Sequence, residues 1–259
     1  MPVTKYIVQL AVAVVVAQNF TPKSPTMEEW TALARLPDFT GVWERVGVGA
    51  GGTAQAGRGQ RATAAVPRAP AYRPEYEAKK RAYQANPPED NETANCLPPG
   101  MPGIMNQPYP MEFLMTPGKV TIIIEAYTQV RHIYTDGRPL PEDPDPKFHG
   151  TSAGHWEGDT LVVETVGFSP LTQIERGVPH SGNMRIVERL RLSGPNTMVI
   201  ETTVNDSLVL VVPYTTTTTL NRHRDWTIAE YICEENNRNS VDVRGKAGID
   251  LRLPLKEDQ

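Results

Sequence analysis

The sequence has little of several features that would identify a function. It contains 2 cysteines among 259 residues, too few for a disulfide-dense miniature domain or a zinc site with four cysteine ligands. Its 26 Lys and Arg residues are outnumbered by 30 Asp and Glu residues, so we expect no nucleic-acid partner, which would usually need a basic face. No apolar run reaches the ~20 residues of a membrane-spanning helix, so no transmembrane segment is expected.

Nucleotide and serine-hydrolase motifs are missing as well. There is no G-x-G-x-x-G after a strand, no G-x-x-x-x-G-K-[ST] and no G-x-S-x-G. The glycines between Gly47 and Gly52 have the wrong spacing for a phosphate-binding loop. We therefore expect no cofactor, and in particular no nicotinamide, flavin or ATP.

The first 18 residues have the pattern of an export signal. Lys5 supplies a positive start, an apolar run interrupted only by Gln9 follows, and Ala17 provides a small residue for cleavage. The alternative is a buried strand or helix at the start of the fold. The export interpretation divides the chain into a signal peptide over 1–18, a tail with a short helix over 19–36 and one β-rich domain over 37–259. It also predicts a secreted or periplasmic protein.

Export changes the meaning of the two cysteines. In an oxidising compartment a pair of cysteines tends to form a disulfide, so we expect a bond between Cys96 and Cys233. Two separate buried thiols are the alternative.

The second half of the chain predicts an antiparallel β-meander. From Pro117 onward apolar residues recur with period two, and Asp-Gly, Gly-Asp and Gly-Pro-Asn sequences separate the candidate strands. Short turns join antiparallel neighbours, and a long meander closes to hide its edges, so we expect a lipocalin-like barrel or half-barrel. The candidate strands are 120–134, 151–156, 160–167, 184–192, 197–205, 208–220 and 226–233. A helix is expected over 73–86, and an irregular turn segment over 96–103, within a proline-rich stretch that continues to 117.

The strand expected over 120–134 has two unlike faces. One is apolar, and the other carries Glu125, Tyr127 and Arg131. This second face is either solvated or lines a polar cavity. In a cavity, burial would raise the pKa of Glu125 for acid–base work, whereas pairing with Arg131 would keep it ionised. His132 falls on the face opposite to Arg131, so both line one cavity only after a twist or a bulge.

Further candidates come from loops and strand ends. His155, Glu157 and Asp159 recur with period two, as metal ligands on one strand do, but Glu-Gly-Asp is better explained as a tight turn, so no metal is expected. His180 ends a loop and is placed for proton transfer near neutral pH. Trp156 and Glu235 complete the candidates for orienting a ligand, with a solvated strand end as the alternative for Glu235.

Four motifs together resemble a large group of exported, largely uncharacterised bacterial proteins. They are FTGVW at 39–43, CLPPGMP at 96–102, GHWEGDTLVVE at 154–164 and CEEN at 233–236, and the likeness spans about 37–246. The resemblance implies export and a β-rich domain, but no reaction. Members often carry His-Ser/Thr-Glu where this chain has His180-Ser181-Gly182, so an acid of that loop is missing here. The hairpin at 156–161 is also similar to those of small lipocalin-like barrels.

Three functions remain open from the sequence. The first is a cofactor-independent isomerase, cyclase or lyase acting on a small, mainly apolar organic molecule, with His180 and Glu125 as the acid–base pair. Tyr127, Arg131, His132, His155, Trp156 and Glu235 would bind the substrate. The second is a non-catalytic, lipocalin-like binding protein. The third is a structural or envelope-associated interaction domain that uses the proline-rich segment.

Overall fold

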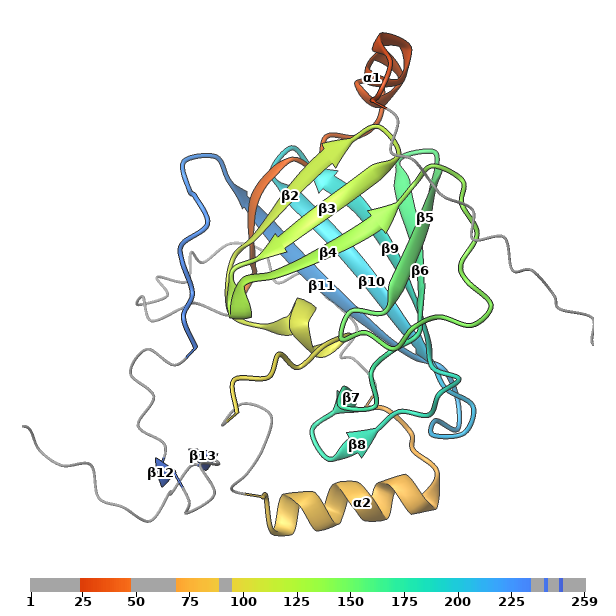
Figure 1. Cartoon of the computed structure of the whole chain (residues 1–259), viewed down its shortest axis with the longest axis vertical. Coiled ribbons are helices and arrows are strands. Elements are labelled where there is room, and N and C mark those ends of the chain that lie inside the picture. Colours follow the sequence, from red (N-terminus) through yellow and green to blue (C-terminus); the bar gives the residue numbers. More distant parts are fainter. Residues whose placement is uncertain (1–23, 48–68, 89–94, 234–239, 242–246, 249–259) are drawn as a thin grey trace, which may run out of the picture.

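A closed barrel of nine strands forms the body of the molecule (Figure 1). The structure is a computed structural model that describes residues 24–47, 69–88, 95–233, 240–241 and 247–248. The order around the barrel is β1-β11-β10-β9-β6-β5-β4-β3-β2, and β2 pairs with β1 to close it. The strands are β1 (Gly41–Arg45), β2 (Met111–Thr116), β3 (Lys119–Ile124), β4 (Gln129–Tyr134), β5 (Thr151–Glu157), β6 (Thr160–Val166), β9 (Arg185–Gly194), β10 (Thr197–Asn205) and β11 (Tyr214–His223). The expected mainly-β meander that closes into a barrel is confirmed.

Tight turns explain why most neighbouring strands are antiparallel. Gly118 between β2 and β3 and Gly158 between β5 and β6 both have positive φ, a conformation that glycine adopts without a Cβ clash. The exception is the pair β4 and β5, which run parallel because the long segment 135–150 separates them. Along the wall side chains alternate in burial, as in β9, where Ile186, Glu188 and Leu190 are buried.

Short elements surround the barrel. Helix α1 (Met27–Leu33) begins with a capping box between Thr26 and Glu29. Helix α2 (Pro74–Ala85) ends before Pro87, as expected, and contacts the small hairpin of β7 (Gln173–Glu175) and β8 (Val178–Pro179) below the barrel (Figure 1). Strands β12 (Ser240–Val241) and β13 (Ala247–Gly248) pair with each other. None of the described helices is long and apolar enough to cross a membrane.

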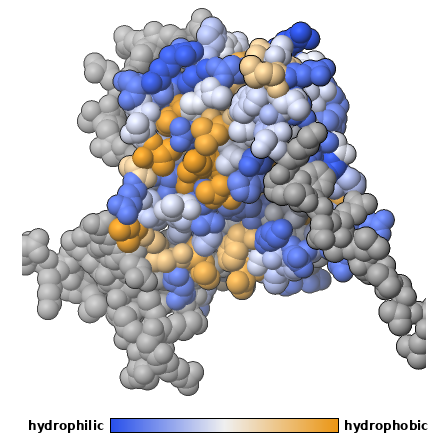
Figure 2. All heavy atoms as spheres, turned by 45° about the horizontal axis from the view of Figure 1, so that its top comes forward, coloured by the Kyte–Doolittle hydropathy of each residue, from blue (hydrophilic) through white to orange (hydrophobic). Residues whose placement is uncertain are grey.

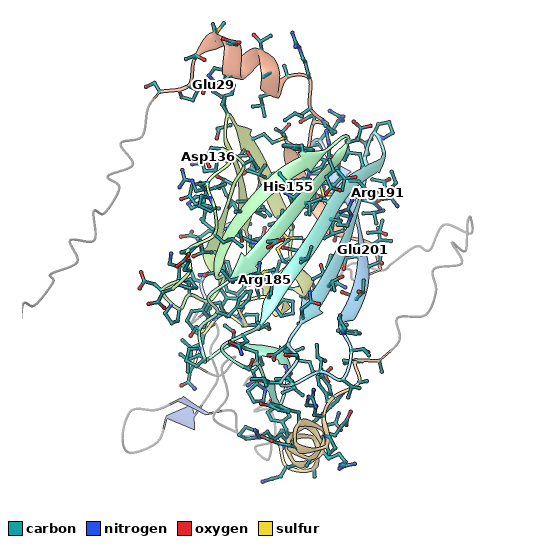
Figure 3. All side chains as sticks on the ribbon, turned by 90° about the vertical axis from the view of Figure 1, so that its right-hand side faces the viewer. Glu29, Asp136, His155, Arg185, Arg191 and Glu201 are labelled. Atoms are coloured by element: carbon teal, nitrogen blue, oxygen red, sulfur yellow. A yellow bond between two sulfur atoms is a disulfide. The ribbon has the colours of Figure 1, made fainter. Side chains whose placement is uncertain are left out.

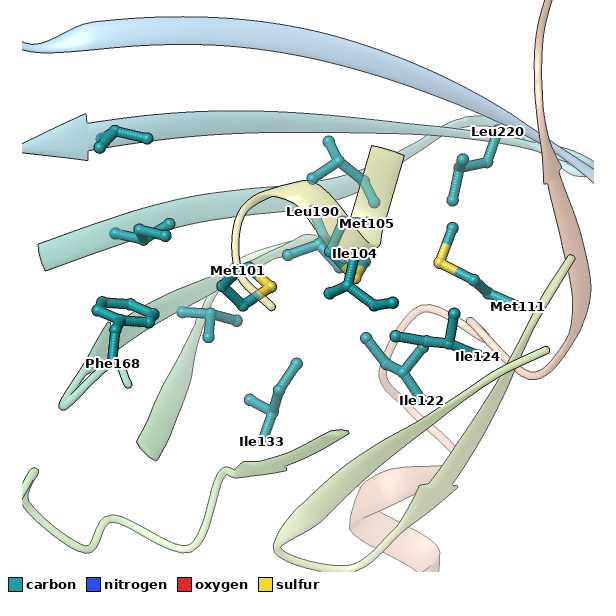
Figure 4. Close-up of a cluster of buried hydrophobic side chains, with 14 of the residues drawn as sticks. Met101, Ile104, Met105, Met111, Ile122, Ile124, Ile133, Phe168, Leu190 and Leu220 are labelled. Carbon is teal, nitrogen blue, oxygen red and sulfur yellow. The ribbon is translucent and has the colours of Figure 1, made fainter. Parts of the chain in front are cut away.

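The barrel interior is filled by a segment of the chain. The 3-10 helix η1 (Gly103–Asn106) and the residues before it form a plug, and Met101, Ile104 and Met105 are buried among the side chains of the strands (Figure 4). A space of about 10 Å³ lies between the plug and the side chains of Glu188 and Ile200. Such a space holds about one water molecule, so no ligand fits between the plug and these side chains.

The disulfide between Cys96 and Cys233 is present, with a Cα–Cα distance of 5.7 Å, as predicted. It joins the plug segment to the chain that follows β11. The bond therefore links two parts of the sequence that are 137 residues apart.

The prediction of one strand over 120–134 is wrong. The chain turns at Glu125, where the 3-10 helix η2 (Ala126–Thr128) leads from β3 into β4. Tyr127 and Thr128 have φ of 58° and 49°, in the left-handed region. This turn reverses the chain, so the buried positions change from even numbers in β3 to Arg131 and Ile133 in β4.

Three other segments differ from the prediction. Strand β2 was not among the predicted strands, and the predicted strand 226–233 has no strand structure. The predicted strand 208–220 begins six residues later, at Tyr214, because Asp206 holds the preceding turn by accepting a hydrogen bond from the backbone of Leu208. The predicted signal peptide lies outside the described residues.

Candidate functional site

A groove opens in the barrel wall between β4 and the segment that leads into β5. The two strands pair only at Ile133 with Ser152 and at Tyr134 with Ala153. The segment 147–151 makes its backbone hydrogen bonds elsewhere: the Lys147 amide donates to Gly167, and the Phe148 carbonyl accepts from Met101 in the plug. A cavity of about 430 Å³ is left along the edge of β4. We call it the wall groove; its lining is 129–132, 134 and 147–152.

The inner end of the wall groove meets a buried polar network centred on Arg131. This side chain is 1% exposed and forms an ion pair with Glu188, whose side chain is fully buried. Its guanidinium donates to both carboxylate oxygens of Glu188, to Ser152 Oγ at 3.3 Å and to Thr165 Oγ1 at 3.1 Å. The Arg131 Nε–H is buried and has no hydrogen-bond partner among the described residues.

His149 forms a wall of the same groove. Its Nδ1 lies 3.3 Å from the carbonyl oxygen of Val130. A carbonyl only accepts, so we assign the ring proton to Nδ1, which leaves Nε2 with a lone pair. That Nε2 is buried and has no hydrogen-bond partner within the described part of the chain. Burial and, second, the charge of Arg131 lower the pKa of His149 to about 4, so the ring is neutral at neutral pH.

The rim of the groove combines charge and aromatic surface. Lys147 and His132 are exposed there. The guanidinium of Arg138 lies over the ring of Tyr134, 3.8 Å from the ring centroid, in a cation–π contact. Burial and the nearby Lys119 lower the pKa of His132. Val130 on the same rim is 47% exposed, and Figure 2 shows hydrophobic side chains gathered on part of the barrel surface.

Arg131 and His132 both line the groove although they lie on opposite faces of β4. On a single regular strand, a twist or a bulge would be needed for this. In the structure, neither is needed. The groove runs along the edge of β4 that has no strand partner before Ile133, and side chains from both faces of a strand border its edge. Arg131 is paired, as one alternative held, but its partner is Glu188 rather than Glu125.

The two residues predicted to be catalytic have other partners. His180 lies near the β7–β8 hairpin, with Nδ1 2.7 Å from the Ser181 carbonyl oxygen and Nε2 2.9 Å from that of Ser169. The Glu125 carboxylate accepts a hydrogen bond from the Ala229 amide at 3.0 Å. These contacts secure loops, and neither residue lines the wall groove.

The remaining predicted binding residues are dispersed. Tyr127 lines a second pocket of about 340 Å³ at the lower barrel mouth, beside the plug and β7. Trp156 packs against Phe39 with ring centroids 5.2 Å apart. His155 lies on the outer surface of β5, with Nε2 3.2 Å from Glu157 (Figure 3). Glu235 lies outside the described residues.

The sequence motif around His155 folds as a turn. Gly158 and Asp159 connect β5 to β6, as the turn interpretation predicted. Within the described ranges, no group of three or more His, Cys, Asp or Glu side chains is arranged to hold a metal ion.

His149 and Lys147 were missed by the sequence argument. They end an irregular segment rich in proline and acidic residues, which has no periodicity from which a cavity can be inferred. The one local signal is Gly150, at φ 65°, where a Cβ would lie 2.6 Å from the Val166 carbonyl oxygen. A glycine between a histidine and a strand indicates a close backbone approach, but only the structure shows what lies opposite.

No family model, curated protein or solved structure matches this chain.

Proposed function

We propose that the protein binds a small organic molecule in the wall groove, with the polar end of the ligand directed at Arg131 and His149. The observation that carries the proposal is the pair of buried polar atoms without hydrogen-bond partners, Arg131 Nε and His149 Nε2, that belong to side chains lining one cavity. Buried polar atoms are nearly always hydrogen-bonded, and each exception needs an explanation. A ligand that satisfies both atoms provides one.

The rest of the groove supports a ligand with an apolar body. Phe148, Tyr134 and Val130 contribute apolar surface near the polar end. A cavity of about 430 Å³ lies within the usual size range of small-molecule sites. This groove therefore supports the mainly apolar ligand expected from the sequence better than the barrel lumen does, because the plug occupies the lumen.

A second candidate function is cofactor-independent acid–base catalysis in the same groove. It is favoured by the neutral ring of His149, whose Nε2 lone pair can accept a proton, near the guanidinium of Arg131, whose Nε–H has no partner among the described residues. Such an N–H donor stabilises an anion that develops when a proton is removed. This version retains the isomerase, cyclase or lyase class and assigns the base to His149 instead of His180.

We further propose that the protein is exported to the periplasm or the medium. The Cys96–Cys233 disulfide supports this, because such bonds persist in oxidising compartments, and so does the apolar start of the sequence. Cell fractionation with mass spectrometry of the chain tests it. Exported protein cleaved near residue 18 is the expected result, and protein that stays in the cytoplasm with an intact N-terminus would contradict it.

A fragment screen tests the binding function. Saturation-transfer NMR with small aromatic acids, amines and neutral amides is expected to give ligands whose affinity falls in His149→Gln and Lys147→Ala. Matched controls are His155→Gln on the outer face of β5 and Lys79→Ala on α2, both of which leave the groove intact. Fragments that bind equally well to all four variants, or no binding fragment at all, would contradict the proposal.

A further inference from the structure

Arg131 and His149 both line the wall groove, and each has one buried polar atom without a hydrogen-bond partner among the described residues. The two atoms are chemically complementary to a single functional group. Arg131 Nε–H is a donor, and the Nε2 of neutral His149 is an acceptor. A ligand group that satisfies both must accept one hydrogen bond and donate another. An ionised carboxylate alone does not, because it only accepts and its lone pairs would face that of Nε2.

A carboxyl group that arrives with a proton has the required pattern. One oxygen accepts from Arg131 Nε–H, and the other oxygen shares a proton with His149 Nε2. The same complex is described as a carboxylic acid beside neutral His149 or as a carboxylate beside its imidazolium. Either description contains one more proton than the empty groove, and no covalent bond in the ligand changes.

We propose that the wall groove binds its ligand through a carboxyl group and takes up one proton from solvent with each carboxylate that it binds. This inference rests on the proposed binding function and specifies the ligand class.

A primary amide could also accept a hydrogen bond from Arg131 Nε–H and donate one to His149 Nε2. The charges around His149 favour a carboxylate over such an amide. Lys147, from the same segment, adds a cation at the rim, and β4 contributes Arg131, His132 and Tyr134. Glu188 on β9 is the acidic side chain that pairs with Arg131, and it is fully buried and does not line the groove. The groove lining described here contains no acidic residue, so an anion meets no like charge in it.

Proton uptake has a defined thermodynamic signature. His149 is neutral in the empty groove over the neutral pH range, because burial and Arg131 disfavour its charged form. A bound carboxylate places a negative charge beside the ring, which offsets the effect of Arg131 and raises the pKa of His149. By linkage, the affinity for the carboxylate then falls about tenfold for each unit of rising pH over the window in which only the complex holds the proton.

Isothermal titration calorimetry with benzoate tests the inference. Benzoate has a flat apolar body for the surface of Phe148 and Tyr134, and a carboxyl group of ordinary pKa stays ionised from about pH 5.5 to 8. We expect the affinity to fall about tenfold per unit between about pH 6 and 7.5. In two buffers of different ionisation enthalpy at about pH 6, we expect the uptake of close to one proton per benzoate.

Variants assign the proton to a residue. His149→Gln keeps a polar side chain of similar reach but cannot take up the proton, so its residual affinity is expected to be independent of pH. His155 is exposed outside the groove, so His155→Gln is expected to keep the wild-type dependence of benzoate affinity on pH. If this pH dependence persists in His149→Gln but disappears in His132→Gln, the proton belongs to His132 and the proposal is overturned.

The outcomes separate this inference from the proposed function. Benzoate that binds in the groove without proton uptake, or benzamide that binds more tightly than benzoate at about pH 6, overturns the carboxyl proposal and leaves the binding function standing. Failure of benzoate and of every other fragment class to bind overturns both.

Discussion

Breaking the buried ion pair beneath the groove is expected to destabilise the barrel strongly. Replacing Arg131 by Met removes the one cation paired with Glu188 among the described residues, although that carboxylate is fully buried. Removing one partner of a buried ion pair costs about 3–5 kcal/mol, because the other charge is left without compensation. With a urea m-value of about 2–3 kcal/mol per molar, the unfolding midpoint should fall by about 1.5 M. Glu188→Gln should lose a similar amount, since it leaves Arg131 charged.

The double variant Arg131→Met with Glu188→Leu separates the charge effect from a packing effect. With both charges gone no ion is left unpaired, and we expect it to regain most of the stability lost by either single variant. The matched control is Arg185→Met, which breaks an ion pair with Glu164 whose side chains are 49% and 44% exposed. It should cost less than about 1 kcal/mol. Single variants that cost less than about 1 kcal/mol, or a double variant that costs their sum, would refute the reasoning.

Three further predictions concern stability. Serine at both Cys96 and Cys233 should lower the free energy of unfolding by about 2–5 kcal/mol, given the long loop that the bond closes, and an unchanged melting temperature in calorimetry would disprove this. The pKa of His149 is about 4 in the folded protein and about 6.5 in an unfolded chain, so the unfolded state binds more protons between these values. Stability should therefore fall as pH drops from about 6.5 to 4, by up to about 3 kcal/mol, and urea titrations of His149→Gln should lack this component. Ile104→Ala in the plug should cost about 2–5 kcal/mol, against less than about 0.5 for Leu114→Ala on the outer face, and equal effects would mean that the plug does not support the barrel.

The sequence predicts the barrel because its strands carry local signals. Period-two burial and glycine turns are properties of a few adjacent residues, so strands such as β5, β6 and β10 follow from the pattern within a residue or two. The disulfide also follows, because two cysteines allow only one pairing.

The turn at Glu125 is less accessible from the sequence. Tyr127 and Thr128 adopt left-handed conformations that their residue types disfavour, so local preferences favour a continuous strand there. This error placed Glu125 and Arg131 on one face and suggested a pair that the hairpin separates. Tertiary packing overrides the local preference at this position.

The wall groove is not predictable from local patterns. It exists because the backbone of segment 147–151 forms hydrogen bonds with the end of β6 and with the plug instead of with the backbone of β4. These partners are far apart in the sequence. Glu188 and Thr165, the partners of Arg131, are 57 and 34 residues away from it in the chain. No periodicity in the sequence encodes such a network.

The location of a bound carboxylate tests the central claim most directly. Amide NMR shifts of the ¹⁵N-labelled protein, recorded with increasing benzoate at about pH 6, report where the ligand binds. The account predicts that the largest changes map to 129–134 and 147–152, on the two sides of the wall groove. Changes confined to 171–176 at the lower barrel mouth, or no changes at saturating benzoate, would contradict it.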